Sequence, residues 1–152
     1  MPVAMLEGTT LSKRFGAFQV LKSVSLSVAA GETLGVVGPN GAGKTTLFGV
    51  LAGAFRPTDG RVLLDGSDVT AASADWRCRL GIARTHQVPR PFRGMRVYEN
   101  VLAAAVFGGG LAGQAAQDGA VEALRPSGLA DCVNRPAASL GLLDRKRLEL
   151  AR

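Results

Sequence analysis

Cysteine and aromatic residues are scarce in this sequence of 152 residues, which has two cysteines and 5% aromatics. Cys78 and Cys132 are too few and too far apart for a disulfide framework or a zinc knuckle, which favours a reducing, cytosolic compartment. Long apolar runs are missing too. The longest uncharged stretch, residues 101–117, contains several glycines and is shorter than the roughly 20 residues of a spanning helix. Charges also interrupt the first thirty residues, so we expect no secretory signal and a protein that is soluble or held at a membrane by a partner.

Acidic residues are outnumbered: 18 Lys and Arg face 12 Asp and Glu, which gives a formal net charge of +6. A positive field favours an anionic partner, such as a nucleotide phosphate, a nucleic acid or an acidic membrane surface, without choosing among them. With 47% hydrophobic and 20% charged residues the composition is that of an ordinary soluble domain, which excludes disordered and collagen-like chains. The length allows one domain with a core of its own.

The first half of the chain predicts strands around a glycine-rich loop. Alternating apolar residues predict a half-buried strand over 24–28, and a continuous apolar stretch predicts a strand buried on both faces over 33–37. The loop follows, and then a helix over 44–52 with Gly53 as its C-terminal cap. Another strand over 61–64 is expected to end in the turn Asp65-Gly66.

The second half is predicted to be mostly helical. After a short helix capped by Ser73 and a strand over 81–85, helical periodicity begins at Val97 and is broken near Gly108 and Pro126. A last helix is expected to begin near Asp144. The implied fold is a sheet with helices on both sides and a small helical insertion.

Residues 38–45 read Gly-Pro-Asn-Gly-Ala-Gly-Lys-Thr and fit the phosphate-loop pattern G-x-x-x-x-G-K-[ST]. Phosphate oxygens need many donors at close range, and main-chain N–H groups supply them where side chains are absent, at Gly38, Gly41 and Gly43. Lys44 would reach the β- and γ-phosphates, and the Thr45 hydroxyl can ligate Mg²⁺. The alternative is a chance glycine-rich turn, but the loop falls between a predicted buried strand and an amphipathic helix. The pattern predicts nucleotide binding and does not by itself predict hydrolysis.

The surroundings of this loop carry a family resemblance. The stretches that carry it occur in the family's order: residues 11–16, 38–46, 64–70, 79–87, 97–102 and 147–152. Together they resemble the ATP-binding subunit of ABC transporters, in the branch that serves branched-chain amino-acid uptake. The resemblance implies an α/β fold: a P-loop NTPase core of an ABC ATPase with a mixed sheet, an antiparallel β subdomain and a helical subdomain. The implied parts are a nucleotide-binding core over 1–88, a helical subdomain over 89–143 and the start of the signature helix over 144–152.

The resemblance also implies site residues. Phe15 matches the aromatic residue that stacks on adenine, with a core role as the alternative, and Val20 would pack beside the sugar. Gln87 matches the loop glutamine that touches both Mg²⁺ and the attacking water, whereas a lone glutamine is ordinarily a solvated surface residue. His86 is interpreted as structural. The implied nucleotide-binding residues are Phe15, Val20, Gly38, Asn40, Gly41, Ala42, Gly43, Lys44, Thr45 and Thr46; the implied catalytic residues are Lys44 and Gln87, and the implied Mg²⁺ ligands are Thr45 and Gln87.

Six arginines and no acid lie between Trp76 and Tyr98, and a solvated face is the ordinary interpretation of such a run. In the resemblance, the loop after Gln87 contacts the membrane subunit, so Arg90 and Arg93 are candidate partner contacts. The absence of interleaved stacking aromatics argues against nucleic acid as the partner.

Two departures from the family pattern concern hydrolysis. The signature L-S-G-G-Q aligns with residues 140–144, where only Leu140 matches and Leu142 and Leu143 add bulk; Asp144 suits a helix N-terminus. The site that this stretch would complete is either degenerate within a heterodimer or tolerates the change with another donor. In addition, no apolar strand ending in Asp-Glu is present, so the chain resembles the N-terminal three-fifths of an ABC ATPase. We expect an unpaired apolar sheet edge, and aggregation or poor nucleotide binding when this polypeptide is expressed alone.

The main functional hypothesis is the ATP-binding subunit of an ABC importer, which couples ATP hydrolysis to uptake of branched-chain amino acids or similar small polar solutes. ATP and Mg²⁺ are the expected cofactors. Transmembrane permease subunits and a second ATP-binding subunit, identical or different, are the expected partners, with no nucleic acid. The expected location is peripheral, on the cytoplasmic face of the inner membrane. The alternatives are a non-hydrolysing nucleotide-binding fragment or pseudo-subunit, and a DNA-associated ABC-like ATPase.

Overall fold

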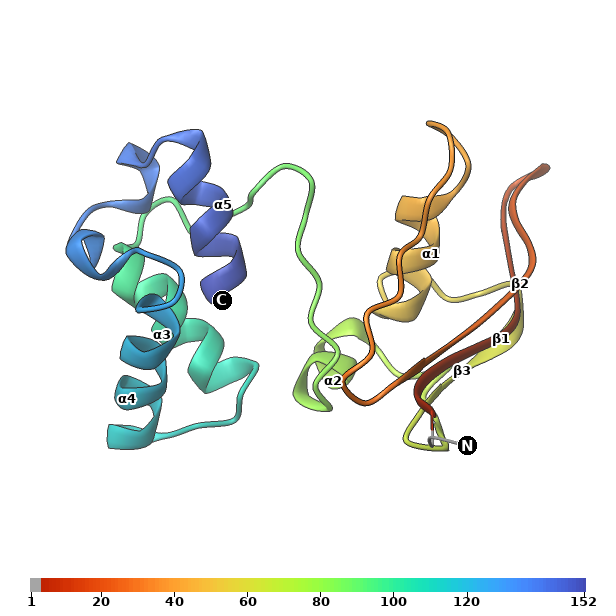
Figure 1. The fold of residues 1–152 in the computed structure, drawn as a ribbon, viewed down its shortest axis with the longest axis horizontal. Helices are drawn as coiled ribbons and strands as arrows, with labels where there is room; N and C mark the ends of the chain where they lie inside the picture. The colour runs from red at the N-terminus through yellow and green to blue at the C-terminus, as the bar shows by residue number, and fades with distance from the viewer. Residues whose placement is uncertain (1–3) are drawn as a thin grey trace. The chain divides into compact units, whose positions relative to one another are not determined.

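The computed structural model describes residues 4–152, which form two compact units (Figure 1). The N-terminal unit reaches to Ile82, and the C-terminal unit comprises Ala83–Arg152. Each unit has a hydrophobic core of its own and is described separately below.

In the described part of the N-terminal unit, four strands form one antiparallel sheet in the order β2-β1-β3-β4. The long strands β1 (Ala4–Phe15) and β2 (Phe18–Ala29) make a hairpin, and β2 contains the predicted strand over 24–28. On the other side of β1 lie β3 (Asp59–Leu64) and then the short edge strand β4 (Ser67–Asp68). Asp65 and Gly66 join these two strands with φ of 46° and 76°, a pair of positive angles that matches the tight hairpin turns and confirms the predicted turn.

Helix α1 (Lys44–Leu51) packs on this sheet, and the short helix α2 (Ala74–Arg79) follows Ser73 as predicted. Gly53, with φ of 80°, ends α1 in the left-handed conformation that glycine adopts without strain. Figure 1 shows both helices on the same side of the sheet, so the prediction of helices on both sides is wrong within this unit. The core between helix and sheet consists of Leu11, Leu21, Leu47, Val50, Leu51, Val62, Leu64 and Val69.

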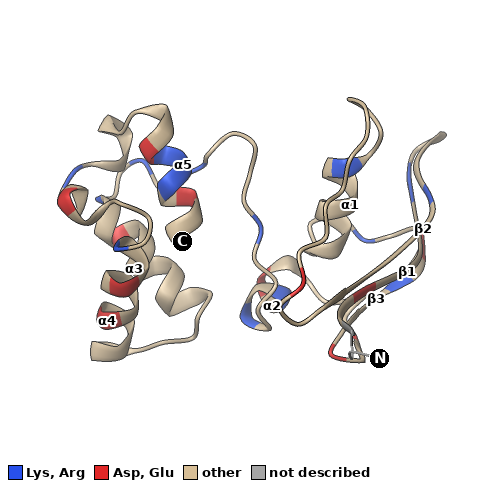
Figure 2. Ribbon diagram, viewed as in Figure 1, with Lys and Arg blue, Asp and Glu red and all other residues tan. Residues whose placement is uncertain are grey.

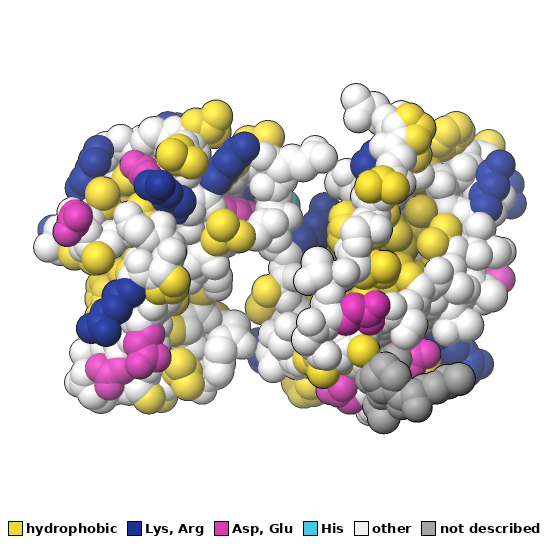
Figure 3. Space-filling model, viewed as in Figure 1, with side chains coloured by type: hydrophobic (Ala, Val, Ile, Leu, Met, Phe, Trp, Pro, Cys, Tyr) yellow, Lys and Arg dark blue, Asp and Glu magenta, His cyan; other side chains and the backbone are white. Residues whose placement is uncertain are grey.

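The predicted strands over 33–37 and 81–85 are wrong: neither segment is a strand in the structure. Leu34 and Val37 are 43% and 94% exposed, whereas a strand buried on both faces requires neighbours that cover it. A strand is defined by main-chain hydrogen bonds to an adjacent strand, and no strand of the described sheet pairs with residues 33–37. Figure 3 shows hydrophobic side chains on the surface of this unit beside α1.

The C-terminal unit is helical, as predicted. It contains α3 (Val97–Phe107), α4 (Gly113–Leu124) and α5 (Leu142–Ala151), with two short 3₁₀ turns at Ala130–Cys132 and Ala137–Ser139. Its core consists of Val97, Val101, Ala120, Leu124, Leu129, Ala137, Leu140 and Leu148. Among the described residues, no helix has both the length and the apolar character needed to span a bilayer.

Candidate nucleotide-binding site

The glycine-rich loop lies directly before α1, and Lys44 is the first residue of that helix. Its ammonium donates to the carbonyl oxygens of Gly38 and Pro39, over 2.6 and 2.7 Å, so the loop wraps around its own cation. Gly41 and Gly43 have φ of 84° and 89°, which other residues adopt only with strain. The positive end of the helix dipole and the lysine charge therefore act at one place (Figure 2). This arrangement suits a phosphate group.

Gly43 also permits a close approach between the loop and β2. A Cβ at this position would meet Val20 Cγ1, the Val20 carbonyl oxygen and Leu21 Cδ2, each at 3.1 Å. The structure therefore places Val20, predicted to lie beside the sugar, against the base of the phosphate loop. Glycine is required here for its backbone angle and for the space it leaves.

Phe15 ends β1 and remains 45% exposed. Its ring meets the ring of Phe55 edge-on, with centroids 5.4 Å apart, and the Lys13 ammonium lies 5.1 Å from its centroid. Phe15 is thus not a buried core residue, and an aromatic surface stays open to solvent. Such a surface can stack on a planar base.

The remaining loop residues surround the start of α1. Asn40, Ala42 and Thr45 are exposed, and Thr46 is half-buried. Among the residues that the structure describes, no group of three or more His, Cys, Asp or Glu side chains gathers to hold a metal ion. A single threonine hydroxyl beside a phosphate site fits Mg²⁺ instead, because Mg²⁺ takes most of its ligands from phosphate and water.

Gln87, the second predicted catalytic residue, belongs to the C-terminal unit and is exposed. Within the N-terminal unit, the structure brings Val20 against Gly43 of the phosphate loop, and it places Phe15 beside Phe55 and Lys13. Residues on both sides of Gln87 are hydrogen-bonded to Glu149 of α5. The main-chain N–H groups of His86 and Arg90 donate to the two carboxylate oxygens, each over 3.1 Å, and His86 Nδ1 lies 2.9 Å from one of them. His86 is thus in contact with Glu149 through both its main chain and its ring.

Glu149 is an unusual carboxylate, with only 9% of its side chain exposed. Burial by itself would raise its pKa. Hydrogen bonds from His86 and from the main chain of Arg90, with the charge of Arg152, outweigh burial and hold the pKa below its usual range. Glu149 therefore stays ionised and keeps its acceptors available.

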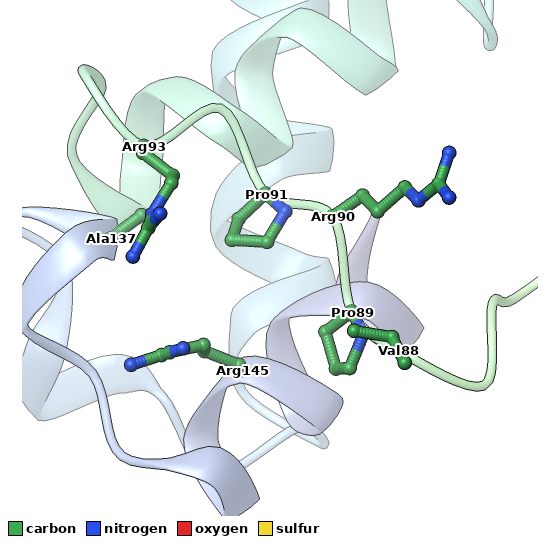
Figure 4. Close-up of a pocket in the computed structure, with 7 residues that line it drawn as sticks. All are labelled: Val88, Pro89, Arg90, Pro91, Arg93, Ala137 and Arg145. Atoms are coloured by element: carbon green, nitrogen blue, oxygen red, sulfur yellow. The ribbon is translucent and has the colours of Figure 1, made fainter.

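A pocket of about 350 Å³ lies in the same unit and is lined by Val88, Pro89, Arg90, Pro91, Arg93, Ala137 and Arg145. Figure 4 shows Arg93 and Arg145 on one side of it, while Arg90 points the other way. The proline rings and Val88 form an apolar wall. The pocket thus combines an apolar surface with two positive charges.

Residues 140–144, the predicted counterpart of the family's signature, lead into α5 and include its first residues. Leu140 is buried, whereas Leu142 and Leu143 are 65% and 62% exposed. Asp144 lies in the first turn of the helix, as predicted, and pairs with Arg147 over 3.2 Å. Two exposed apolar side chains therefore stand in the first turn of α5.

Comparison with known proteins identifies the family of this phosphate-loop fold. The sequence profile described as "ABC transporter" matches residues 21–152, most of the chain. The chain belongs to the ABC transporter family. The expected ATP-binding-cassette fold is confirmed by a solved ATP-binding cassette of an ABC transporter in its ADP conformation, which is 28% identical to this chain. The match has a TM-score of 0.78 and covers 97% of this chain and 65% of the other.

Curated relatives of this ABC chain include branched-chain transport proteins. The high-affinity branched-chain amino acid transport ATP-binding protein LivG of Escherichia coli K12 is 36% identical and is matched over 100% of this chain. BraF of Pseudomonas aeruginosa, with the same description, is 34% identical over 97% of this chain. The chain spans 65% of the length of LivG and 64% of that of BraF. The resemblance to the branched-chain branch is thus confirmed.

Sequence reasoning missed two functional or structural side chains. Arg77 was counted in a solvated basic face, yet it is 1% exposed and donates to main-chain carbonyls. Glu149 was not singled out. Its spacing from Arg145 and Arg152 puts the three residues on one helix face, but the sequence does not show which segment that face contacts.

Proposed function

We propose that this chain supplies the nucleotide-binding part of an ABC importer subunit, which couples ATP hydrolysis to uptake of branched-chain amino acids or similar small polar solutes. The observation that carries the proposal is the phosphate loop, with the Lys44 ammonium held by the carbonyls of Gly38 and Pro39 at the start of α1. A triphosphate offers this ammonium stronger acceptors than the two carbonyls. Lys44 would then exchange its internal contacts for the β- and γ-phosphates.

The other residues take roles that agree with their positions. Thr45 would hold Mg²⁺, which, when bound, neutralises charge on the phosphates. Phe15 would stack on adenine with its exposed ring face, and Val20 would pack beside the sugar. Gln87 would orient the attacking water.

Membership of the ABC transporter family supports the proposed partners. Two transmembrane permease subunits and a second ATP-binding subunit would complete the transporter, with this chain peripheral at the cytoplasmic face of the membrane. The pocket beside Arg93 and Arg145 suits an apolar segment with an acidic residue, and supports a permease contact there.

A second candidate is a non-hydrolysing nucleotide-binding subunit. It is favoured by the exposed Leu142 and Leu143, since bulky side chains stand where the family's signature brings main chain close to phosphate. This candidate predicts ATP binding without turnover.

The test is steady-state ATP hydrolysis by the intact protein with Mg²⁺. Lys44→Ala should lower the rate by about 100-fold or more, since loss of a positioned cation removes transition-state stabilisation of that order. Lys22→Ala, which removes an exposed lysine of β2, should leave the rate unchanged. Hydrolysis that survives Lys44→Ala would contradict the assignment, and binding without hydrolysis in the wild type would favour the second candidate. Uptake of labelled leucine, compared with urea, tests the solute.

A further inference from the structure

The segment that contains Gln87 is fastened to α5 at two points. The N–H of His86 donates to Oε1 of Glu149, and the N–H of Arg90 donates to Oε2, each over 3.1 Å. One carboxylate therefore holds two main-chain groups four residues apart, and Gln87 lies between them. Gln87 itself is exposed, so its side chain is free to meet a ligand while its backbone is held.

Further contacts hold the C-terminal side of the same segment. Arg152 donates from Nη1 to the Arg90 carbonyl over 2.9 Å, and its guanidinium carbon lies 4.6 Å from the centroid of the Phe92 ring. Buried Asn100 accepts from the Phe92 N–H over 2.7 Å and donates to the Phe92 carbonyl over 3.1 Å. These contacts restrain residues 90–92, and among the described side chains it is Glu149 that also bonds the main chain of His86.

These contacts give Glu149 a role outside its own helix. Its side chain is 9% exposed, and the hydrogen bonds described for its carboxylate go to His86 and Arg90. Charged acceptors bind main-chain N–H groups more strongly than neutral ones do. A carboxylate in this place therefore restrains the backbone on both sides of Gln87.

We infer that Glu149 is the positioning residue for Gln87 and links it to α5. The inference rests on the proposed function, in which Gln87 orients the attacking water. Because α5 begins with the altered signature stretch at Leu142, any shift of α5 displaces Glu149 and with it the backbone of His86 and Arg90. Gln87 thus moves together with the start of the signature helix.

The experiment compares wild type, Glu149→Gln and Glu122→Gln in the intact protein. Glu122 is an exposed residue of α4, so its variant makes the same charge change away from the segment. Amide hydrogen exchange is measured for the peptide that contains residues 84–92. Glu149→Gln should exchange about tenfold faster or more there, because its NH₂ group cannot accept a hydrogen bond in place of the lost oxygen. Glu122→Gln should match the wild type.

Steady-state ATP hydrolysis in the same proteins separates positioning from stability. Glu149→Gln should lower kcat by about 10- to 100-fold, because misplacement of a reacting group by about 1 Å has effects of that order. KM for ATP should change less than about twofold, because the inferred role concerns the attacking water and not nucleotide binding. If Glu149→Gln does not fold, Glu149→Asp replaces it: the charge stays, the shorter side chain cannot reach both N–H groups, and both effects should be smaller.

The outcomes are distinguishable. Wild-type hydrolysis with an unchanged kcat in the Glu149 variant overturns the inference and leaves the proposed function standing. Unchanged amide exchange overturns the inference as well. A wild type that binds no ATP overturns the proposed function and with it the role of Gln87. A rise in KM with unchanged kcat would show that Glu149 acts on nucleotide binding instead, which also overturns the inference.

Discussion

Replacement of Arg77 by methionine should destabilise the N-terminal unit. Arg77 is 1% exposed, and its guanidinium donates to the carbonyls of Val50 and Leu51 over 2.7 Å each and to that of Thr70 over 2.9 Å. The first two carbonyls belong to the last turn of α1, where helix carbonyls lack partners within the helix and a positive charge is favourable. Arg77 therefore caps α1 from outside.

The expected cost follows from these bonds. Val50 keeps a second donor, the Gly53 N–H at 3.2 Å, so the carbonyls of Leu51 and Thr70 lose most. Two buried acceptors left without a charged donor cost about 1–3 kcal/mol each. Burial lowers the pKa of Arg77, against a smaller opposing effect of Asp68, which shows that the buried charge is itself unfavourable. Replacement by methionine removes this unfavourable charge and so offsets part of the loss. We expect Arg77→Met to lower the free energy of unfolding by about 2–4 kcal/mol.

Urea unfolding followed by the fluorescence of Trp76 measures this effect, because Trp76 is the only tryptophan of the sequence and lies in α2. Arg79→Met is the matched control: Arg79 is in the same helix, and its exposed pair with Asp75 is 3.9 Å long. Such a surface change should stay within about 0.5 kcal/mol. Equal unfolding midpoints for Arg77→Met and Arg79→Met would refute the reasoning.

Three further predictions concern the phosphate loop, the aromatic ring and the buried carboxylate. Gly43→Ala should lower the free energy of urea unfolding by about 1–3 kcal/mol and abolish ATP binding. The control is Gly31→Ala, at a φ of 76° with open space around it, which should lose only the stability that the unfavourable backbone angle costs. Equal losses of unfolding free energy in the two variants would argue against a tight contact at Gly43. Phe15→Ala should weaken ATP binding by about 1–3 kcal/mol and leave the binding of inorganic triphosphate unchanged. Phe18→Ala, which removes a residue that is 71% exposed, is the control. Equal weakening of ATP and triphosphate binding in Phe15→Ala would exclude stacking on adenine. Because the pKa of Glu149 is lowered, its stabilising contribution is complete above about pH 4.3 and is lost as the pH falls through the lowered value. Wild type should therefore lose urea stability below about pH 4.3 more steeply than Glu149→Gln, and parallel pH curves would contradict this.

Local features of the fold could be predicted from the sequence. The loop over 38–45, the helix after it and the Asp65-Gly66 turn depend on residue types within a few positions of one another, and the structure has each of them. The helical character of residues 97–151 follows in the same way from periodicity. Short-range signals were enough for these elements.

Features that depend on distant partners could not be predicted. The apolar run over 33–37 has the composition of a buried strand, but composition does not supply a neighbouring strand, and Val37 is 94% exposed. Arg77 is buried although the nearest acid in sequence, Asp75, pairs with Arg79 instead. The acceptors of Arg77 are main-chain carbonyls, which every residue carries. The contacts of Glu149 could not be predicted for the same reason, since two of its donors are main-chain N–H groups. A segment that contributes only main-chain groups to such a contact needs no particular residue type, so its sequence does not indicate the contact.

Calorimetric titration of the intact protein with ATP in the presence of Mg²⁺ tests the central assignment most directly. Saturable heat is predicted for the wild type and for Lys22→Ala, and its loss is predicted for Lys44→Ala, whose ammonium no longer lies among the loop carbonyls. A wild type that gives no heat with any adenine nucleotide would contradict the account.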